Sequence, residues 1–287
     1  NNEKAFRLAC EDGHLEVAKW LIEISVEKKL GTIDIHAHNE FAFRFACKNG
    51  YLEVAKWLIE ISVEKKLICG SSAIASQADR DTQRGSEVID IHANNEFDFR
   101  FSCDRGHLEI AKWLLEISEE KKEVINIHAD NEYAFCWACY NNHLHVAKWL
   151  IEISKEKNLG IINIHIDNED AFRWACCHNH LEMAKWLVEI SKEKELICET
   201  DNDPLRGSSS ANDPLRGSGA VDIHVNNDYV FRSTYANNYF HISSWLLTLY
   251  TKKELINLNH PLAREELENR KKINIELISY LYSQKFK

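Results

Sequence analysis

Two stretches of helical periodicity recur next to each other along this chain. In residues 34–66, small and aromatic apolar side chains recur at helical spacing, at Ala42, Phe43, Ala46 and Cys47, and predict a short helix. A second helix is predicted from about Leu52 to Lys65, with apolar residues spread widely around it. The Asn49-Gly50 pair between the two sets is typical of a helix end and a chain reversal. The pattern therefore predicts a short inner helix, a tight turn and a longer second helix that needs neighbours on more than one side.

Tryptophan marks the period of this pattern. Six tryptophans share one position on the second helix: Trp20, Trp57, Trp113, Trp149, Trp186 and Trp245. Each after the first follows the histidine of an Ile-His pair by 21 residues, and these histidines are His36, His92, His128, His165 and His224. The ordinary period of 36 or 37 residues is typical of a tandem array whose neighbouring repeats bury a shared core. We therefore expect the tryptophans to pack between repeats.

Two intervals between tryptophans are too long for this period. The second and third tryptophans are 56 residues apart and the fifth and sixth are 59 apart, so each interval holds about 20 extra residues. The excess lies at about 69–88 and 198–219, in segments rich in Ser, Gly, Ala and Asp without helical or strand periodicity. This composition predicts two exposed loops, inserted after the second and fifth repeats.

Each repeat opens with a short β-branched segment around its Ile-His pair. In the second repeat this segment predicts a short hairpin-like loop, with Asn39 as the helix N-cap and Glu40 in the first turn. Toward the C-terminus the pattern fades, so we expect six repeats over 1–253 and a helical capping unit over 254–287. Within that unit, residues 255–258 imitate a hairpin strand. Two helices are expected after it, from Pro261 to about Asn269 and from Ile273 to Ser283.

The repeated phrases resemble those of ankyrin repeats. Gly-His-Leu-Glu-Val-Ala-Lys-Trp-Leu at residues 13–21 is similar to the family's turn and second helix, and Asp-Ile-His-Ala at 34–37 is similar to its hairpin strand. The resemblance covers essentially residues 1–253 and implies a mainly α solenoid that binds a protein partner along its concave face. Residues 41–44, Phe-Ala-Phe-Arg, depart from the family's Thr-Pro-Leu-His motif. In style the repeats resemble ankyrin-repeat proteins of giant DNA viruses that infect amoebae.

Charge and composition exclude several classes of partner. The 287 residues carry a net charge of −10, which argues against binding to nucleic acid or to an anionic membrane. No apolar run approaches the roughly 18 residues of a membrane-spanning helix. The chain opens inside a repeat, at Asn1-Asn2-Glu3, so we expect further sequence upstream.

Cysteine and histidine recur at fixed positions of the repeat. Five cysteines share one inner-helix position: Cys10, Cys47, Cys103, Cys139 and Cys176. Packed helices lie about 8–10 Å apart, too far for a disulfide, so we expect buried thiols in a reducing compartment. The expected location is the cytoplasm, or, if the protein is viral, the host cell cytoplasm or the virion. The Ile-His histidines, one per repeat, are equally too far apart to share a zinc ion. Neither a metal nor a cofactor is expected.

The ankyrin resemblance also implies that the Ile-His position can be a target of oxygen-dependent hydroxylation, which the sequence leaves open.

Positions that differ between the copies are the candidate binding residues. They lie at the hairpin tips and along the inner helices, where aromatic side chains beside polar ones suit a protein partner. They are His38, Phe41, Asn94, Phe97, Arg105, Asp130, Tyr133, Tyr140, Asp167, Asp170, His178 and Tyr229. A second recurring set, Arg7, Arg44, Arg100, Arg173 and Arg232, is expected to brace the hairpins through backbone carbonyls or a neighbouring Glu.

The sequence therefore predicts a protein-interaction scaffold without catalysis, binding its partner along the concave face and the insert loops. No enclosed nucleophile–base pair or phosphate-binding glycine loop favours an enzyme. Two alternatives stay open. The array could be a structural component of a virion or other assembly, associating with itself through the inserts, or it could be a substrate adaptor for a ubiquitin ligase.

Overall fold

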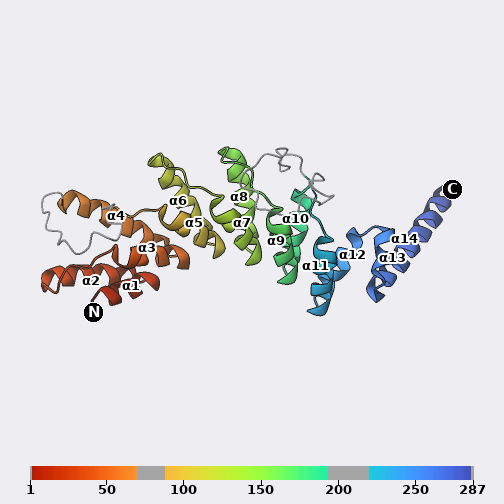
Figure 1. The fold of residues 1–287 in the computed structure, drawn as a ribbon, viewed down its shortest axis with the longest axis horizontal. Helices are drawn as coiled ribbons and strands as arrows, with labels where there is room; N and C mark the ends of the chain where they lie inside the picture. The colour runs from red at the N-terminus through yellow and green to blue at the C-terminus, as the bar shows by residue number, and fades with distance from the viewer. Residues whose placement is uncertain (1, 70–87, 193–219, 286–287) are drawn as a thin grey trace. The chain divides into compact units, whose positions relative to one another are not determined.

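The computed structural model describes residues 2–69, 88–192 and 220–285, which form fourteen helices and no strand (Figure 1). Twelve of them make six pairs of an inner and a second helix, as predicted. The pairs are α1 (Asn2–Glu11) with α2 (Leu15–Glu27), α3 (Ala37–Asn49) with α4 (Leu52–Cys69), α5 (Ala93–Asp104) with α6 (Leu108–Glu120), α7 (Ala129–Tyr140) with α8 (Leu144–Glu156), α9 (Ile166–Cys177) with α10 (Leu181–Ile190), and α11 (Val225–Ala236) with α12 (Phe240–Leu249). The predicted inserts, about 69–88 and 198–219, lie outside the described residues except for Cys69 and Val88.

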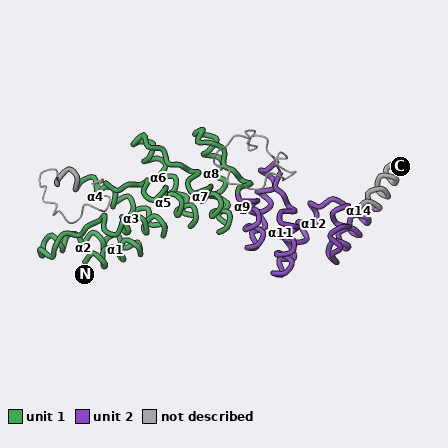
Figure 2. Tube along the Cα trace, viewed as in Figure 1, with its two compact units in different colours: residues 1–166 green, residues 167–287 purple. Residues whose placement is uncertain are grey.

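The chain divides into two compact units, residues 1–166 and 167–287 (Figure 2). Helices α1 to α8 belong to the first unit. The second unit holds α10 to α14 and nearly all of α9. The predicted division of the sequence into repeats over 1–253 and a capping unit over 254–287 stays a prediction.

One phenylalanine per inner helix forms the centre of each repeat's core. These side chains expose at most 1% of their surface, and they are Phe6, Phe43, Phe99, Phe135, Phe172 and Phe231. In the first unit, the tryptophan of the following repeat packs against this ring, with centroid distances of 6.3, 6.4 and 6.2 Å for Trp57, Trp113 and Trp149. The predicted packing between repeats is confirmed there. Trp20, in the first repeat of the given sequence, is 54% exposed, and for this residue the packing stays a prediction.

The recurring cysteines are buried free thiols, as predicted. Burial raises the pKa of Cys10 to about 12, and it holds the pKa of Cys47 well above the usual range. A buried neutral thiol packs as a small apolar side chain and is a poor nucleophile. These cysteines therefore belong to the core.

A left-handed turn of three residues opens each of the last five repeats. The turns are residues 38–40, 94–96, 130–132, 167–169 and 226–228, all with φ between 47° and 63°. This conformation costs roughly 1–2 kcal/mol for each residue that has a side chain, although Asn tolerates it better than most. Asn39 lies at the centre of the first turn, so its predicted N-cap role is wrong. Among the described residues the turn also takes the place of the predicted hairpin strands.

The C-terminal region is more helical than the sequence predicts. Helix α13 (Lys252–Leu258) occupies the segment expected to imitate a strand, and α14 (Pro261–Lys285) is a single helix where two were expected. A capping box starts α13. Thr251 Oγ1 accepts a hydrogen bond from the Glu254 amide at 3.3 Å, and the Glu254 carboxylate accepts one from the Thr251 amide at 2.6 Å.

Changing Gly50 to alanine should destabilise the protein by about 2–4 kcal/mol. Gly50 has a φ of +90°, and a Cβ there would lie 2.7 Å from Cε1 of His107 in the next repeat. Gly31 provides a matched control, because its φ is +97° but a Cβ added there would meet nothing within 4 Å. Denaturant unfolding of both alanine variants tests this. Equal losses of stability would show that the close approach of His107 contributes nothing.

Candidate functional site

Three inner helices of the first unit, α3, α5 and α7, expose aromatic side chains at recurring positions. On α3 the buried face comprises Ala42, Phe43, Ala46 and Cys47, and the outward face comprises Phe41, Arg44, Phe45 and Lys48. The outward faces of α5 and α7 carry aromatic residues at corresponding positions. We name the set the aromatic row: Phe41, Phe45, Phe97, Phe101, Tyr133, Trp137 and Tyr140.

Rings of the aromatic row contact one another within a helix and between helices. On α5, Phe97 stacks on Phe101 with ring centroids 4.1 Å apart. On α7, Tyr133 and Trp137 stack at 5.4 Å, and Trp137 contacts Tyr140 at 4.9 Å. Phe101 lies 5.5 Å from Tyr133, so the row passes from one repeat into the next. The contacts within a helix form because residues three or four apart lie on the same helix face.

Cations of the same chain cover several of these rings. The guanidinium of each preceding repeat lies over the first ring of the next, at 5.4 Å for Arg7 over Phe41, 3.8 Å for Arg44 over Phe97 and 4.7 Å for Arg100 over Tyr133. The ammonium of Lys48 lies 5.2 Å from Phe45 and 5.3 Å from Phe101. These distances fall within the range of cation–π attraction. The outward face therefore alternates aromatic and cationic groups along α3 and α5.

The arginines also hold the left-handed turns. Arg100, which is 7% exposed, donates hydrogen bonds to the carbonyls of Asn95 at 2.7 Å and Asn94 at 3.2 Å. Carbonyls of the turns likewise accept from Arg44, Arg173 and Arg232. The predicted role of backbone carbonyls is confirmed for these four arginines. The acidic partner of Arg100 is Asp130 of the next repeat, however, and not the predicted Glu.

The last residue of each left-handed turn joins two neighbouring repeats. Oε1 of Glu132 lies 2.9 Å from Nδ1 of His128 in its own repeat and accepts the amide of Asn163 from the following linker at 3.1 Å. Glu40 and Glu96 make the same two contacts, with His36 and Asp90 and with His92 and Asn126. In the second unit, Glu169 accepts the amide of Asp222 at 3.2 Å. The Ile-His histidines therefore have a structural role in the connection between repeats.

Eight of the twelve predicted binding residues lie on the left-handed turns or on the aromatic row. His38, Asn94, Asp130 and Asp167 are the exposed first residues of left-handed turns, and Phe41, Phe97, Tyr133 and Tyr140 belong to the aromatic row. Arg105 is exposed immediately after α5. In the second unit, Asp170 pairs with Arg173, the imidazole of His178 donates a hydrogen bond to the Trp174 carbonyl, and Tyr229 is 43% exposed. Their role in binding stays a prediction.

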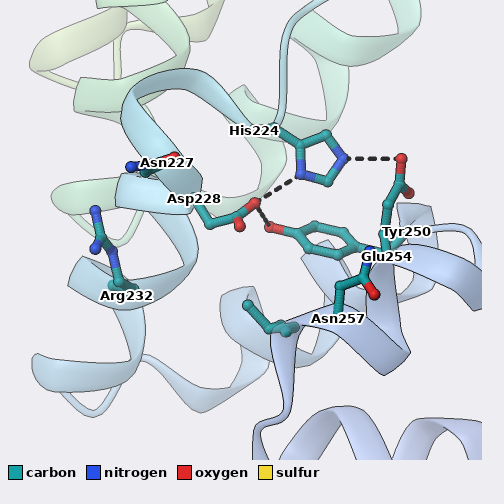
Figure 3. Close-up of a pocket in the computed structure, with 8 residues that line it drawn as sticks. His224, Asn227, Asp228, Arg232, Tyr250, Glu254 and Asn257 are labelled. Carbon is teal, nitrogen blue, oxygen red and sulfur yellow. Dashed lines mark hydrogen bonds and ion pairs between the residues drawn. The ribbon is translucent and has the colours of Figure 1, made fainter.

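A pocket of about 440 Å³ lies in the second unit, where the last repeat meets α13 (Figure 3). The imidazole of His224 lies between the carboxylates of Asp228, at 2.6 Å, and Glu254, at 3.5 Å. The Tyr250 hydroxyl donates a hydrogen bond to Asp228 at 2.8 Å. In other repeats the corresponding acid accepts a backbone amide instead. Burial, and then the hydrogen bond to Asp228, raises the pKa of Tyr250. The same histidine–acid pair recurs through the array, so these groups fasten α13 to the last repeat.

The described residues offer no group of three or more His, Cys, Asp or Glu side chains that could hold a metal ion. Within that part of the chain, every helix is too short or too polar to cross a membrane.

Part of the aromatic row is absent from the candidate binding residues indicated by the sequence. Phe45, Phe101 and Trp137 are not among those candidates, yet they are partly exposed and in contact with the predicted binding residues. Their four-residue spacing from Phe41, Phe97 and Tyr133 is the available signal, because it places each pair on one helix face. The acids at the ends of the left-handed turns are also missed as links between repeats.

Comparison with known proteins identifies the repeat. Residues 99–198 match the family model described as ankyrin repeats (3 copies). No curated protein matches the chain. Among solved structures, an ankyrin repeat family protein from Legionella pneumophila is similar, with 16% identity, 86% of this chain and 70% of that chain covered, and a TM-score of 0.40. The matched segment therefore carries ankyrin repeats, and helix pairs with the same order and turn geometry lie on both sides of it. The predicted mainly α repeat fold is confirmed.

Proposed function

We propose that this array of ankyrin-type repeats binds a protein partner along its inner helices, with the aromatic row as the anchoring surface and without catalysis. Ankyrin repeats are in general modules of protein–protein interaction. The observation that supports the proposal here is the continuity of the row, whose rings contact one another from α5 to α7. Partly exposed aromatic side chains of this kind dominate the energy of protein interfaces.

The core does not require these rings to be aromatic. Each inner helix already buries a phenylalanine in its centre, and the row lies on the opposite, outward face. In the second unit the corresponding outward positions hold Asp170, Trp174 and Tyr229, of which Trp174 is 41% and Tyr229 is 43% exposed. The proposed surface of that unit is therefore more mixed in character, with an acid in place of one ring.

Of the narrower attributions, a viral origin rests on resemblance of style alone. A viral origin, a location in the host cytoplasm or the virion, and self-association through the inserts belong to this proposal, as does the alternative role of a building block in an assembly. None of them is needed for the binding role of the aromatic row.

Four substitutions to glutamate, at Phe41, Phe97, Tyr133 and Tyr229, should reduce capture of the partner more than tenfold, because each removes an apolar anchor and buries a charge at the interface. Affinity purification from the natural cell, with mass spectrometry of the captured proteins, measures this. The matched control places four glutamates at exposed apolar residues elsewhere: Val17, Val63, Val124 and Phe240. A partner retained equally by both variants would place binding outside the aromatic row. Thermal unfolding should show both variants folded.

A further inference from the structure

The alternation of rings and cations stops at α7. Cys136 occupies the helix position held by Arg44 on α3 and Arg100 on α5, and Tyr140 occupies the position held by Lys48. Among the described residues, no lysine or arginine lies over the ring of Trp137. Trp137 is also the most exposed ring of the row, at 38%. The strongest cation–π acceptor of the row therefore lacks the cation that its counterparts receive from their own chain.

Two aromatic rings contact Trp137, and acidic groups lie close to one of them. Tyr133 stacks on Trp137 from one side and Tyr140 contacts it at 4.9 Å. Burial raises the pKa of Tyr133, and the carboxylates of Asp104 and Asp130 add to that shift, because both lie close to the phenol. Rings with carboxylates beside them make an environment that stabilises a positive charge.

The charge of the whole chain points the same way. A net charge of −10 attracts positively charged partners and repels acidic ones before contact is made. The acids near Tyr133 are in part balanced by Arg100 and Arg105, so the local preference depends on the face of the Trp137 ring as well as on the overall charge.

We propose that Trp137, flanked by Tyr133 and Tyr140, receives a lysine or arginine side chain of a basic segment in the protein partner. The partner's cation takes the position that Lys48 holds over Phe45 within this chain. The inference rests on the proposed function, since it names the chemistry of the partner that the aromatic row binds.

The test uses the whole chain and a defined probe. The probe is an acetylated and amidated ten-residue peptide of alternating lysine and serine, and the matched peptide has glutamate in place of lysine. The indole N–H resonance of Trp137, assigned with Trp137→Phe, should shift saturably with the lysine peptide and remain unchanged with the glutamate peptide. Affinity is measured on the same samples by fluorescence anisotropy of the labelled peptide.

Tyr140→Lys supplies the missing cation from within the chain and should weaken binding of the lysine peptide about three- to tenfold. Glu152→Gln, at an exposed residue of α8, changes the net charge by the same amount and should leave the affinity within about twofold. Trp137→Leu keeps an apolar side chain and should weaken binding at least as much as Tyr140→Lys. Thermal unfolding confirms that each variant is folded.

Equal affinities for wild type, Tyr140→Lys and Trp137→Leu, or an unshifted Trp137 resonance, would overturn the inference. That outcome would leave the proposed function standing if capture of a cellular partner still depends on the aromatic row. Conversely, capture that is insensitive to the row would contradict the proposed function, whereas a Trp137-dependent affinity for the lysine peptide would still support the cation site.

Discussion

Replacing Asp98 with alanine is expected to raise the free energy of unfolding at neutral pH by about 1–3 kcal/mol. Asp98 is 1% exposed, and neither of its carboxyl oxygens has a hydrogen-bond partner among the described residues. Burial raises its pKa well above the usual value; Arg44 opposes this shift, and Glu40, Asp90 and Glu96 add to it. A buried carboxyl without partners is therefore a cost to the folded state that the substitution removes.

Alanine already occupies the equivalent site in three other repeats. Ala42, Ala134 and Ala171 hold the equivalent position on α3, α7 and α9, and each is at most 1% exposed. Asp98 thus departs from a position that other repeats fill with a methyl group. Chemical denaturation of the wild type and Asp98→Ala at pH 7 measures the gain.

The gain should depend on pH in a defined direction. Because the pKa of Asp98 is raised in the folded state, the unfolded chain loses this proton first as the pH rises. Between the unfolded and folded pKa values, the wild type then loses about 1.4 kcal/mol per pH unit relative to Asp98→Ala. The stability difference between the two proteins should accordingly be smallest near pH 4 and largest at neutral pH.

Two controls separate the charge from the change in size. Asp98→Asn keeps the shape without the ionisable group, so its pH dependence should match that of Asp98→Ala. Asp12→Ala removes an exposed carboxyl and should change stability by no more than about 0.5 kcal/mol. A lower stability of Asp98→Ala than of the wild type at pH 7 would mean that Asp98 has a favourable partner in solution.

The repeat architecture could be predicted because it depends on local signals that recur. Apolar spacing, the Gly50-type turns and the tryptophan period each indicate the same helix pair, and α1 to α12 follow them. The left-handed turns could not be predicted in this way. Asn39 is equally suited to an N-cap and to a positive φ, and the choice depends on contacts that Glu40 makes with His36 and with the next repeat.

The candidate site could also be predicted only in part. Comparison of copies indicates Phe41, Phe97 and Tyr133, because these positions vary in residue type while the core does not. Spacing alone cannot say which face of a helix the neighbouring repeats cover, so it does not separate Trp137 from the packing residues. In α13 a capping box outweighs the strand-like apolar residues. The signal at Asp98, an acid where its counterparts are alanine or valine, is present in the sequence but has meaning only once burial is known.

Replacing Glu132 with alanine should have the opposite effect to Asp98→Ala, lowering the free energy of unfolding by about 2–5 kcal/mol. Glu132 is 6% exposed, and its carboxylate is the acceptor for both the His128 imidazole and the Asn163 amide. The alanine variant leaves two donors without an acceptor at the connection between repeats, although the backbone keeps the same unfavourable left-handed turn. The strain of that turn would then no longer be offset by the contacts that select it.

Glu132→Gln distinguishes the acceptor from the charge. Its amide oxygen can still accept the Asn163 amide, so the expected loss is smaller than that of Glu132→Ala. Hydrogen exchange at the Asn163 amide should become faster in the alanine variant and change less in the glutamine variant, since exchange reports opening of this bond. Glu152→Ala on the exposed face of α8 serves as the reference, with an expected change within about 0.5 kcal/mol. If Glu132→Ala unfolds at the same denaturant concentration as Glu152→Ala, the acids of the left-handed turns do not hold the repeats together, and the recurrence of these acids has another cause.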